Sequence, residues 1–189
     1  MGNFSEPFRQ QPKDGYQYAG IVACPVAPTS RGNVTIISND TKDLPIINPN
    51  WLATETDQQV AIAAYKRIRT AFHSKEMAPI VIGDEYDPGI QYTTDAQILE
   101  AIRNSVMTIF HASCTCKMGM RNDTMAVVDS RARVFGVDGL RVVDVSAFPL
   151  LVPGHPQSSV CKCSSGMIEL MLTFVDMLAE KIADDIIHS

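Results

Sequence analysis

The stretch AVVDSRARVFGVDGLRVVDVSAFP, residues 126–149, decides the fold of this chain of 189 residues. Three short runs within it have the pattern of β-strands: Ala126–Asp129, Ala132–Phe135 and Leu140–Asp144. The sequence GVDG between the last two runs predicts a turn. Asp144 ends the third run, immediately before a loop rich in Pro and Gly.

Two histidines flank this stretch, one on each side. His111 lies in TIFHASCTCKMG (108–119) and His155 lies in PGHPQSSV (153–160). A neutral imidazole accepts a proton near pH 7, so two histidines in these settings indicate one active site assembled from two segments. The other two histidines of the chain, His73 and His188, lie on a predicted helix and at the tail.

Composition and charge narrow the functional class. The chain is 46% hydrophobic and 20% charged, with a net charge of −5, as in an ordinary globular protein. The acidic balance argues against a nucleic-acid surface. Residues 1–20 lack the apolar core of a signal peptide. No uncharged apolar run is long enough to span a membrane, so we expect neither nucleic acid nor a membrane as partner.

Glycosylation sequons point to the secretory route. Four of the seven asparagines lie in N-x-S/T sequences: Asn3, Asn33, Asn39 and Asn122. Chance would give about one such site in this chain. We therefore expect a parent protein that is secreted or passes through the secretory pathway, with polar turns that match by chance as the alternative.

The five cysteines comprise two C-x-C pairs and one single residue: Cys114 with Cys116, Cys161 with Cys163, and Cys24. This spacing rarely allows a disulfide within a pair, so the pattern is not a disulfide framework. Cys114 and Cys116 lie near His111, as in a partial metal site. A further ligand at suitable spacing is missing, and we predict no bound metal.

Capping boxes predict two helices. Thr56 with Gln59 opens the first. Its apolar stripe is Val60, Ala64, Ile68 and Phe72. Thr94 with Gln97 opens a shorter helix. Its apolar residues are Ile98, Ile102 and Val106.

The remaining segments are read from their turns and apolar runs. Residues 17–24 and 32–38 are predicted strands, residues 45–49 are extended, and residues 83–92 form a loop. Residues 106–119 read as an apolar strand that ends in a loop of small residues. The terminal helix, residues 177–187, places Leu178, Ile182 and Ile186 on one face.

Together these phrases resemble the C-terminal part of the glucose–methanol–choline (GMC) family of flavin-dependent oxidoreductases. The matching segments cover nearly the whole chain: APTSRGNVTI (27–36), INPNWL (47–52), TIFHASCTCKMG, residues 126–149 and PGHPQSSV. HASCTCKMG and PGHPQSSV are most similar to fungal members linked to secondary metabolism. The resemblance implies an α+β fold, a mostly antiparallel sheet with packed helices, plus a return strand and helix of the FAD-binding domain.

The resemblance also implies a domain division. Residues 1–125 correspond to a portion of the substrate-binding domain, and residues 126–189 return to the FAD-binding domain. The G-x-G-x-x-G sequence with which the family begins, and which binds the FAD adenylate, is absent here. We therefore expect a C-terminal fragment that lacks most of the FAD site and is inactive in isolation.

The activity implied by the resemblance is oxidation of a small-molecule alcohol on FAD. A general base removes the hydroxyl proton while hydride leaves for the flavin. His155 is the predicted base and His111 the group that positions the substrate oxygen, with coupled titrations. A non-redox cyclase or lyase step, or an inactive product of a damaged gene, are the alternatives. Substrate, electron acceptor and oligomeric state stay open.

The resemblance also implies which residues contact the cofactor. Asp144 and Val145 are expected to face the ribityl–pyrophosphate part of FAD. The backbone around Pro156 and Gln157 is expected to approach the isoalloxazine ring. The alternative for Asp144 is a simple cap of a helix or loop.

Residues 161–176 depart from the family, whose members run from PGHPQSSV directly into a segment like YMLAEKIADDI. Back-translation allows the splice-donor sequence GTAAGT across Cys161–Cys163 and an acceptor AG across Val175–Asp176. Removal of the intervening bases would leave one tyrosine codon and restore the family phrase. We predict a translated retained intron, and the alternative is a genuine insertion that extends the last helix.

Overall fold

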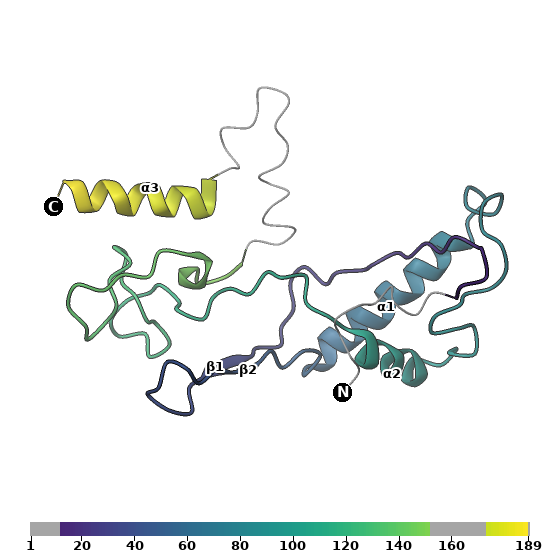
Figure 1. Cartoon of the computed structure of the whole chain (residues 1–189), viewed down its shortest axis with the longest axis horizontal. Helices are drawn as coiled ribbons and strands as arrows, with labels where there is room; N and C mark the ends of the chain where they lie inside the picture. Colours follow the sequence, from purple (N-terminus) through teal and green to yellow (C-terminus); the bar gives the residue numbers. More distant parts are fainter. Residues whose placement is uncertain (1–11, 152–172, 189) are drawn as a thin grey trace, which may run out of the picture. The chain divides into compact units, whose positions relative to one another are not determined.

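The computed structural model describes residues 12–151 and 173–188. The elements in chain order are β1 (Asn33–Thr35), β2 (Ile46–Asn48), α1 (Glu55–Phe72), α2 (Asp95–Ser105), a 3₁₀ turn η1 (Val145–Ala147) and α3 (Thr173–Ile187) (Figure 1). They belong to two compact units, Met1–Thr108 and Ile109–Ser189. Helices combined with antiparallel pairing make this an α+β fold, as predicted. The predicted division at residue 125 refers to domains of a whole enzyme and stays a prediction.

The two strands of the first unit form an antiparallel hairpin. Val34 pairs with Ile47 at its centre. Gly32 precedes β1 because the returning chain passes so close that a Cβ would lie 2.8 Å from the carbonyl oxygen of Pro49. The strand predicted over residues 17–24 is wrong. That segment has no neighbouring strand among the described residues, and without a partner an extended run forms no ladder.

The N-cap of helix α1 lies two residues before the predicted one. Thr54, not Thr56, is the N-cap, and its hydroxyl accepts from the amide of Asp57. The Thr54 hydroxyl also lies 2.6 Å from that of Thr29, a contact that local sequence does not reveal. The predicted stripe is shifted too, since Val60 is exposed while Asp57 and Ile62 are buried.

Helix α2 begins as predicted. The Thr94 hydroxyl accepts from the amide of Gln97, and the Gln97 side chain accepts from the amide of Thr94, which completes the capping box. Ile98 is almost fully buried, and α2 packs against α1. The small core of the first unit consists of Ala61, Ile62, Ile98 and Ala101.

The second unit is built from tight turns rather than full strands. Single bridges join Val128 with Val134 and Arg133 with Arg141, so the three predicted strands shrink to isolated pairs. Asp129 explains the curvature, because its carboxylate accepts from the amides of Arg131 and Arg133 and holds residues 129–133 in a turn. A turn of this kind leaves too few residues in line for a longer ladder.

Helix α3 lies against that turn. The Arg131 guanidinium donates to the carbonyl oxygen of Asp185 at 3.2 Å, and Lys181 donates to the carbonyl oxygen of Ser130 at 3.3 Å. Ile182 is buried, as its predicted place on the apolar face requires, whereas Ile186 is exposed. No helix in the described part of the chain is long and apolar enough to cross a membrane.

Candidate functional site

His111 lies in an irregular segment of the second unit. Its side chain is half-buried. In the sequence, His111 lies between Phe110 and Cys114, whose φ angles are both positive, 64° and 66°. Two such residues interrupt the extended run, so the strand predicted from residue 106 onward is wrong. Non-glycine residues hold this conformation only where the surrounding structure enforces it, and such positions cluster at functional sites.

The segment after His111 is hydrogen-bonded to the segment after Asp144. The amides of Cys114, Cys116 and Met118 donate to the carbonyl oxygens of residues 145, 146 and 147, at 3.2, 2.9 and 2.8 Å. Alternate amides of residues 114–118 thus donate to the three consecutive carbonyls of η1. The structure therefore brings together two of the motifs that the sequence singles out.

Asp144 is the N-cap of η1. Its carboxylate accepts from the amide of Ser146 at 2.7 Å and is otherwise exposed. Hydrogen bonds from the side chain and then the backbone of Ser146 hold the pKa of Asp144 below its usual range. Asp144 therefore caps η1 and its carboxylate is charged at neutral pH, while its expected approach to FAD stays a prediction.

His155, Pro156 and Gln157 lie outside the described residues. Their expected approach to His111 and to a flavin stays a prediction. The same holds for residues 161–172 of the predicted insertion, while residues 173–176 belong to α3.

The cysteines that the structure describes are all free thiols. Cys24 is exposed, and Cys114 and Cys116 are half-buried. Within the described residues, no group of three or more His, Cys, Asp or Glu side chains is arranged to hold a metal ion.

Sequence reasoning missed a hollow of about 380 Å³ in the second unit. Met118 and Phe135 contribute to its apolar lining, and the guanidinium of Arg121 lies 5.8 Å from the centre of the Phe135 ring. The phrase CKMGM, in which apolar residues follow the histidine loop, is the only sequence signal for it.

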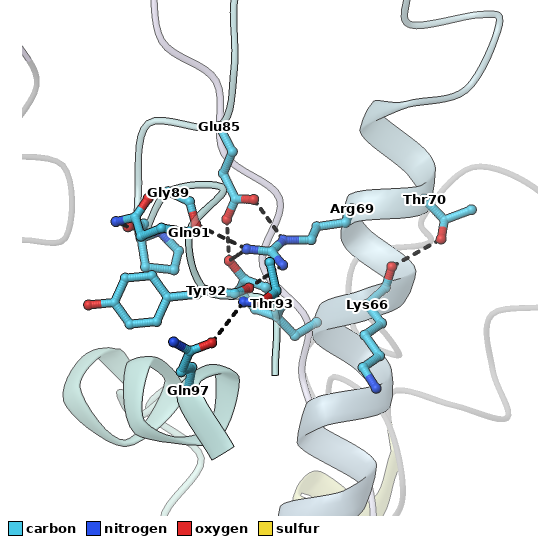
Figure 2. A network of polar contacts seen from close by, with 11 residues as sticks. Lys66, Arg69, Thr70, Glu85, Gly89, Gln91, Tyr92, Thr93 and Gln97 are labelled. Atoms are coloured by element: carbon cyan, nitrogen blue, oxygen red, sulfur yellow. Dashed lines mark hydrogen bonds and ion pairs between the residues drawn. The ribbon is translucent and has the colours of Figure 1, made fainter. Parts of the chain in front are cut away.

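A polar network in the first unit was also missed (Figure 2). Arg69 on α1 donates from Nε to Glu85 at 2.7 Å and from its terminal nitrogens to the carbonyl oxygens of Tyr92 and Gly89. Tyr65 donates to Glu85, and the guanidinium lies 4.8 Å above the Tyr65 ring. The network attaches the loop of residues 83–92 to α1. Only the spacing of Tyr65 and Arg69, one helical turn apart, could have suggested it.

Known proteins match this chain over most of its length. The model of the GMC oxidoreductase family matches residues 28–162, which include His111 and Asp144. The chain belongs to the GMC oxidoreductase family. The resemblance inferred from the sequence is confirmed.

Relatives from fungi are closely similar to this GMC chain. Patulin synthase of Aspergillus clavatus is 53% identical over 94% of this chain and 26% of its own length. Versicolorin B synthase of Aspergillus parasiticus is 46% identical over 78% of this chain and 23% of its own length. The chain thus spans about a quarter of the relatives that it matches, and these are fungal enzymes of secondary metabolism, as expected.

Solved structures agree. An FAD-dependent oxidoreductase from Chaetomium thermophilum is 32% identical, with a TM-score of 0.67 over 85% of this chain and 25% of that one. A fungal aryl-alcohol oxidase is 27% identical, with a TM-score of 0.66 over 86% of this chain and 24% of that one.

Proposed function

We propose that this chain is the C-terminal share of an FAD-dependent oxidoreductase that acts on the CH–OH group of a small alcohol. The observation that carries the proposal is the set of three hydrogen bonds from residues 114, 116 and 118 to η1, within a GMC match. These bonds fix the segment that follows the candidate catalytic histidine, His111, against the candidate cofactor segment that begins at Asp144.

The residues around η1 fit part of FAD. Within the described part of the chain, the amide of Val145 donates no hydrogen bond, so it can donate to a pyrophosphate oxygen. The charged Asp144 carboxylate repels phosphate but accepts hydrogen bonds from ribityl hydroxyls. When bound, FAD supplies the acceptor for the hydride of the alcohol.

The two histidines have different roles toward the substrate hydroxyl. His155 accepts its proton, and His111 donates or accepts a hydrogen bond that orients its oxygen. The half-buried position of His111 on a conformationally fixed segment supports a role in positioning.

The test uses a chimera in which this chain replaces the aligned quarter of the Aspergillus clavatus relative. We expect retained flavin absorbance and bleaching of the flavin when candidate alcohols are added without oxygen. His155→Ala lowers the rate about 10²–10⁴-fold, as loss of a general base does. His73→Ala, an exposed histidine at the end of α1, serves as control and leaves the rate unchanged.

The same chimera separates the alternatives. Product formed with no flavin bleaching supports the non-redox step. The names of two relatives, patulin synthase and versicolorin B synthase, are the reason to test it. A chimera that binds FAD but converts none of the alcohols contradicts the proposed oxidation.

Residues 161–176 are proposed to be a translated intron. The end of the family match at residue 162 supports this proposal. Replacing the segment with a single tyrosine should raise flavin retention in the chimera. Transcript sequencing that finds no spliced form would contradict it.

A further inference from the structure

The hollow in the second unit combines an apolar lining with one positive charge. Its volume of about 380 Å³ lies in the range of small-molecule sites. Met118, Met120 and Phe135 supply apolar surface, and Arg121 lines the hollow beside them. The Arg121 guanidinium lies 5.8 Å from the centre of the Phe135 ring and forms no ion pair with another described residue. Such a lining suits a ligand that has one apolar face and polar groups around it.

A glycosylation sequon, Asn122-Asp123-Thr124, begins directly after this lining. Asn122 follows Arg121 in the sequence and is exposed in a turn. The first sugar of an N-linked glycan is covalently bonded to the side-chain amide of the asparagine. A glycan on Asn122 would therefore begin one residue away from the hollow.

The turn that carries the sequon has a fixed shape. The amide of Asp123 donates to the carbonyl oxygen of Met120 at 2.9 Å. The Asp123 carboxylate accepts from the amide of Met125 at 2.9 Å and from Nζ of Lys117 at 2.6 Å. A preformed site loses little conformational freedom when it binds, and a covalently attached sugar has a high effective concentration beside it.

N-acetylglucosamine, the first sugar of N-linked glycans, matches this lining. One face of its ring carries C–H groups, which pack on aromatic and methionine side chains as other apolar groups do. Its hydroxyls and its acetamido oxygen accept hydrogen bonds from a guanidinium. We propose that the hollow binds the first N-acetylglucosamine of a glycan on Asn122, with the apolar face of the sugar against Phe135 and its polar groups toward Arg121.

The proposal rests on passage through the secretory pathway, where a lipid-linked oligosaccharide diphosphate is the sugar donor, and not on the flavin chemistry. The Asn122 amide nitrogen loses a proton and bonds to C1 of the sugar, while the lipid diphosphate leaves with the electron pair of its C1–O bond. A sugar in the hollow joins the turn of residues 120–125 to Phe135, so it should slow the local opening of both.

The experiment compares the full chain with and without one sugar on Asn122. The chain secreted from a yeast host and trimmed with endoglycosidase H keeps a single N-acetylglucosamine at each occupied site, and the same chain from a bacterial host carries none. Mass spectrometry of peptides gives the occupancy of Asn122. Amide hydrogen exchange over residues 118–135 should be about 2- to 10-fold slower with the sugar than without it.

This slowing is measured within each variant, so any loss of stability that the substitution itself causes cancels. Phe135→Leu removes the ring and Arg121→Gln removes the charge, and each should lose most of the slowing. Val137→Leu is the matched control and should keep it, because Val137 is an exposed residue of the same unit that does not line the hollow. Asn122→Gln leaves the other sequons intact and should abolish the slowing.

Two results would overturn the proposal, and they differ in cause. Absence of sugar from Asn122 in the secreted chain means that the site is not modified. Full occupancy with equal exchange rates means that the sugar stays outside the hollow. Slowing that Phe135→Leu and Arg121→Gln both leave unchanged means the same.

Discussion

Asp57 and Thr29 are joined by two hydrogen bonds although 28 residues separate them. The amide of Thr29 donates to the Asp57 carboxylate at 2.7 Å and its hydroxyl at 2.9 Å. The amide of Ser30 donates to the second carboxylate oxygen at 2.8 Å. The carboxylate is 4% exposed. It therefore connects the first turn of α1 to the loop that leads into β1.

Asp57→Asn should destabilise the chain by about 1–3 kcal/mol, because an amide nitrogen would face the Ser30 amide and two donors cannot pair. Urea unfolding measures the change. Asp43→Asn, on the exposed hairpin loop, is the control and should shift stability by less than about 0.5 kcal/mol. Equal effects of both variants would show that the buried carboxylate adds nothing.

Asp57 also predicts a dependence on pH. Burial alone would raise the pKa of Asp57, but the hydrogen bonds from Ser30 and Thr29 outweigh it and hold the pKa well below its usual range. A lowered folded-state pKa gives stability that is present above about pH 4 and is lost as the pH falls toward the folded pKa. Unfolding measured from about pH 5 to about pH 2 should therefore show a steeper loss for the unmodified chain than for Asp57→Asn. Parallel curves would contradict this.

Arg69 and Glu85 form a half-buried pair whose removal should loosen the loop of residues 83–92. Arg69→Met leaves one oxygen of the Glu85 carboxylate and two loop carbonyls without the donor that Arg69 supplies, while Tyr65 still donates to the other oxygen. The expected cost is about 1–3 kcal/mol. Amide hydrogen exchange of the loop and thermal unfolding measure the effect. Lys66→Met, which removes the exposed Lys66–Asp95 pair, is the matched control and should cost less than about 1 kcal/mol. Slow exchange in Arg69→Met would contradict the attachment of the loop.

Thr94→Ala should shorten or fray α2, because the hydroxyl accepts from the Gln97 amide at the first turn. The expected loss is about 0.5–2 kcal/mol, read from urea unfolding and helical circular dichroism. Thr93→Ala, on the adjacent exposed threonine, tests the same change of side chain outside the cap. A larger loss at Thr93 than at Thr94 would contradict the capping box.

The three sequons that the structure describes, at Asn33, Asn39 and Asn122, are exposed. When the chain is directed through the secretory pathway of a yeast host, we expect N-linked glycans on Asn39, at a bend of the loop between β1 and β2, and on Asn122, in a turn. Mass spectrometry before and after endoglycosidase treatment checks this. The double variant Asn39→Gln with Asn122→Gln should lose the shift, and an unchanged mass in the unmodified chain would contradict the prediction.

The sequence predicts features that depend on a few neighbouring residues. The Thr94 cap is confirmed because donor and acceptor are three positions apart and nothing distant competes. The Thr56 cap is wrong because Thr29, far away in the sequence, contacts Thr54 instead. The strand predictions were the least accurate, since residues 17–24 have an extended pattern but no partner strand among the described residues. For the site, motifs located His111 and Asp144, whereas the hydrogen bonds that relate their segments depend on backbone geometry that no motif specifies.

The hydrogen bonds between residues 114–118 and η1 limit the insertions and deletions that this region tolerates. Because alternate amides meet consecutive carbonyls, a one-residue insertion or deletion between Cys114 and Met118 would put the donors on one side of it out of register with η1. Side chains there can be exchanged while this spacing is kept. The turn of residues 120–125 does not share this constraint. Across related enzymes, differences in length should therefore occur outside residues 114–118.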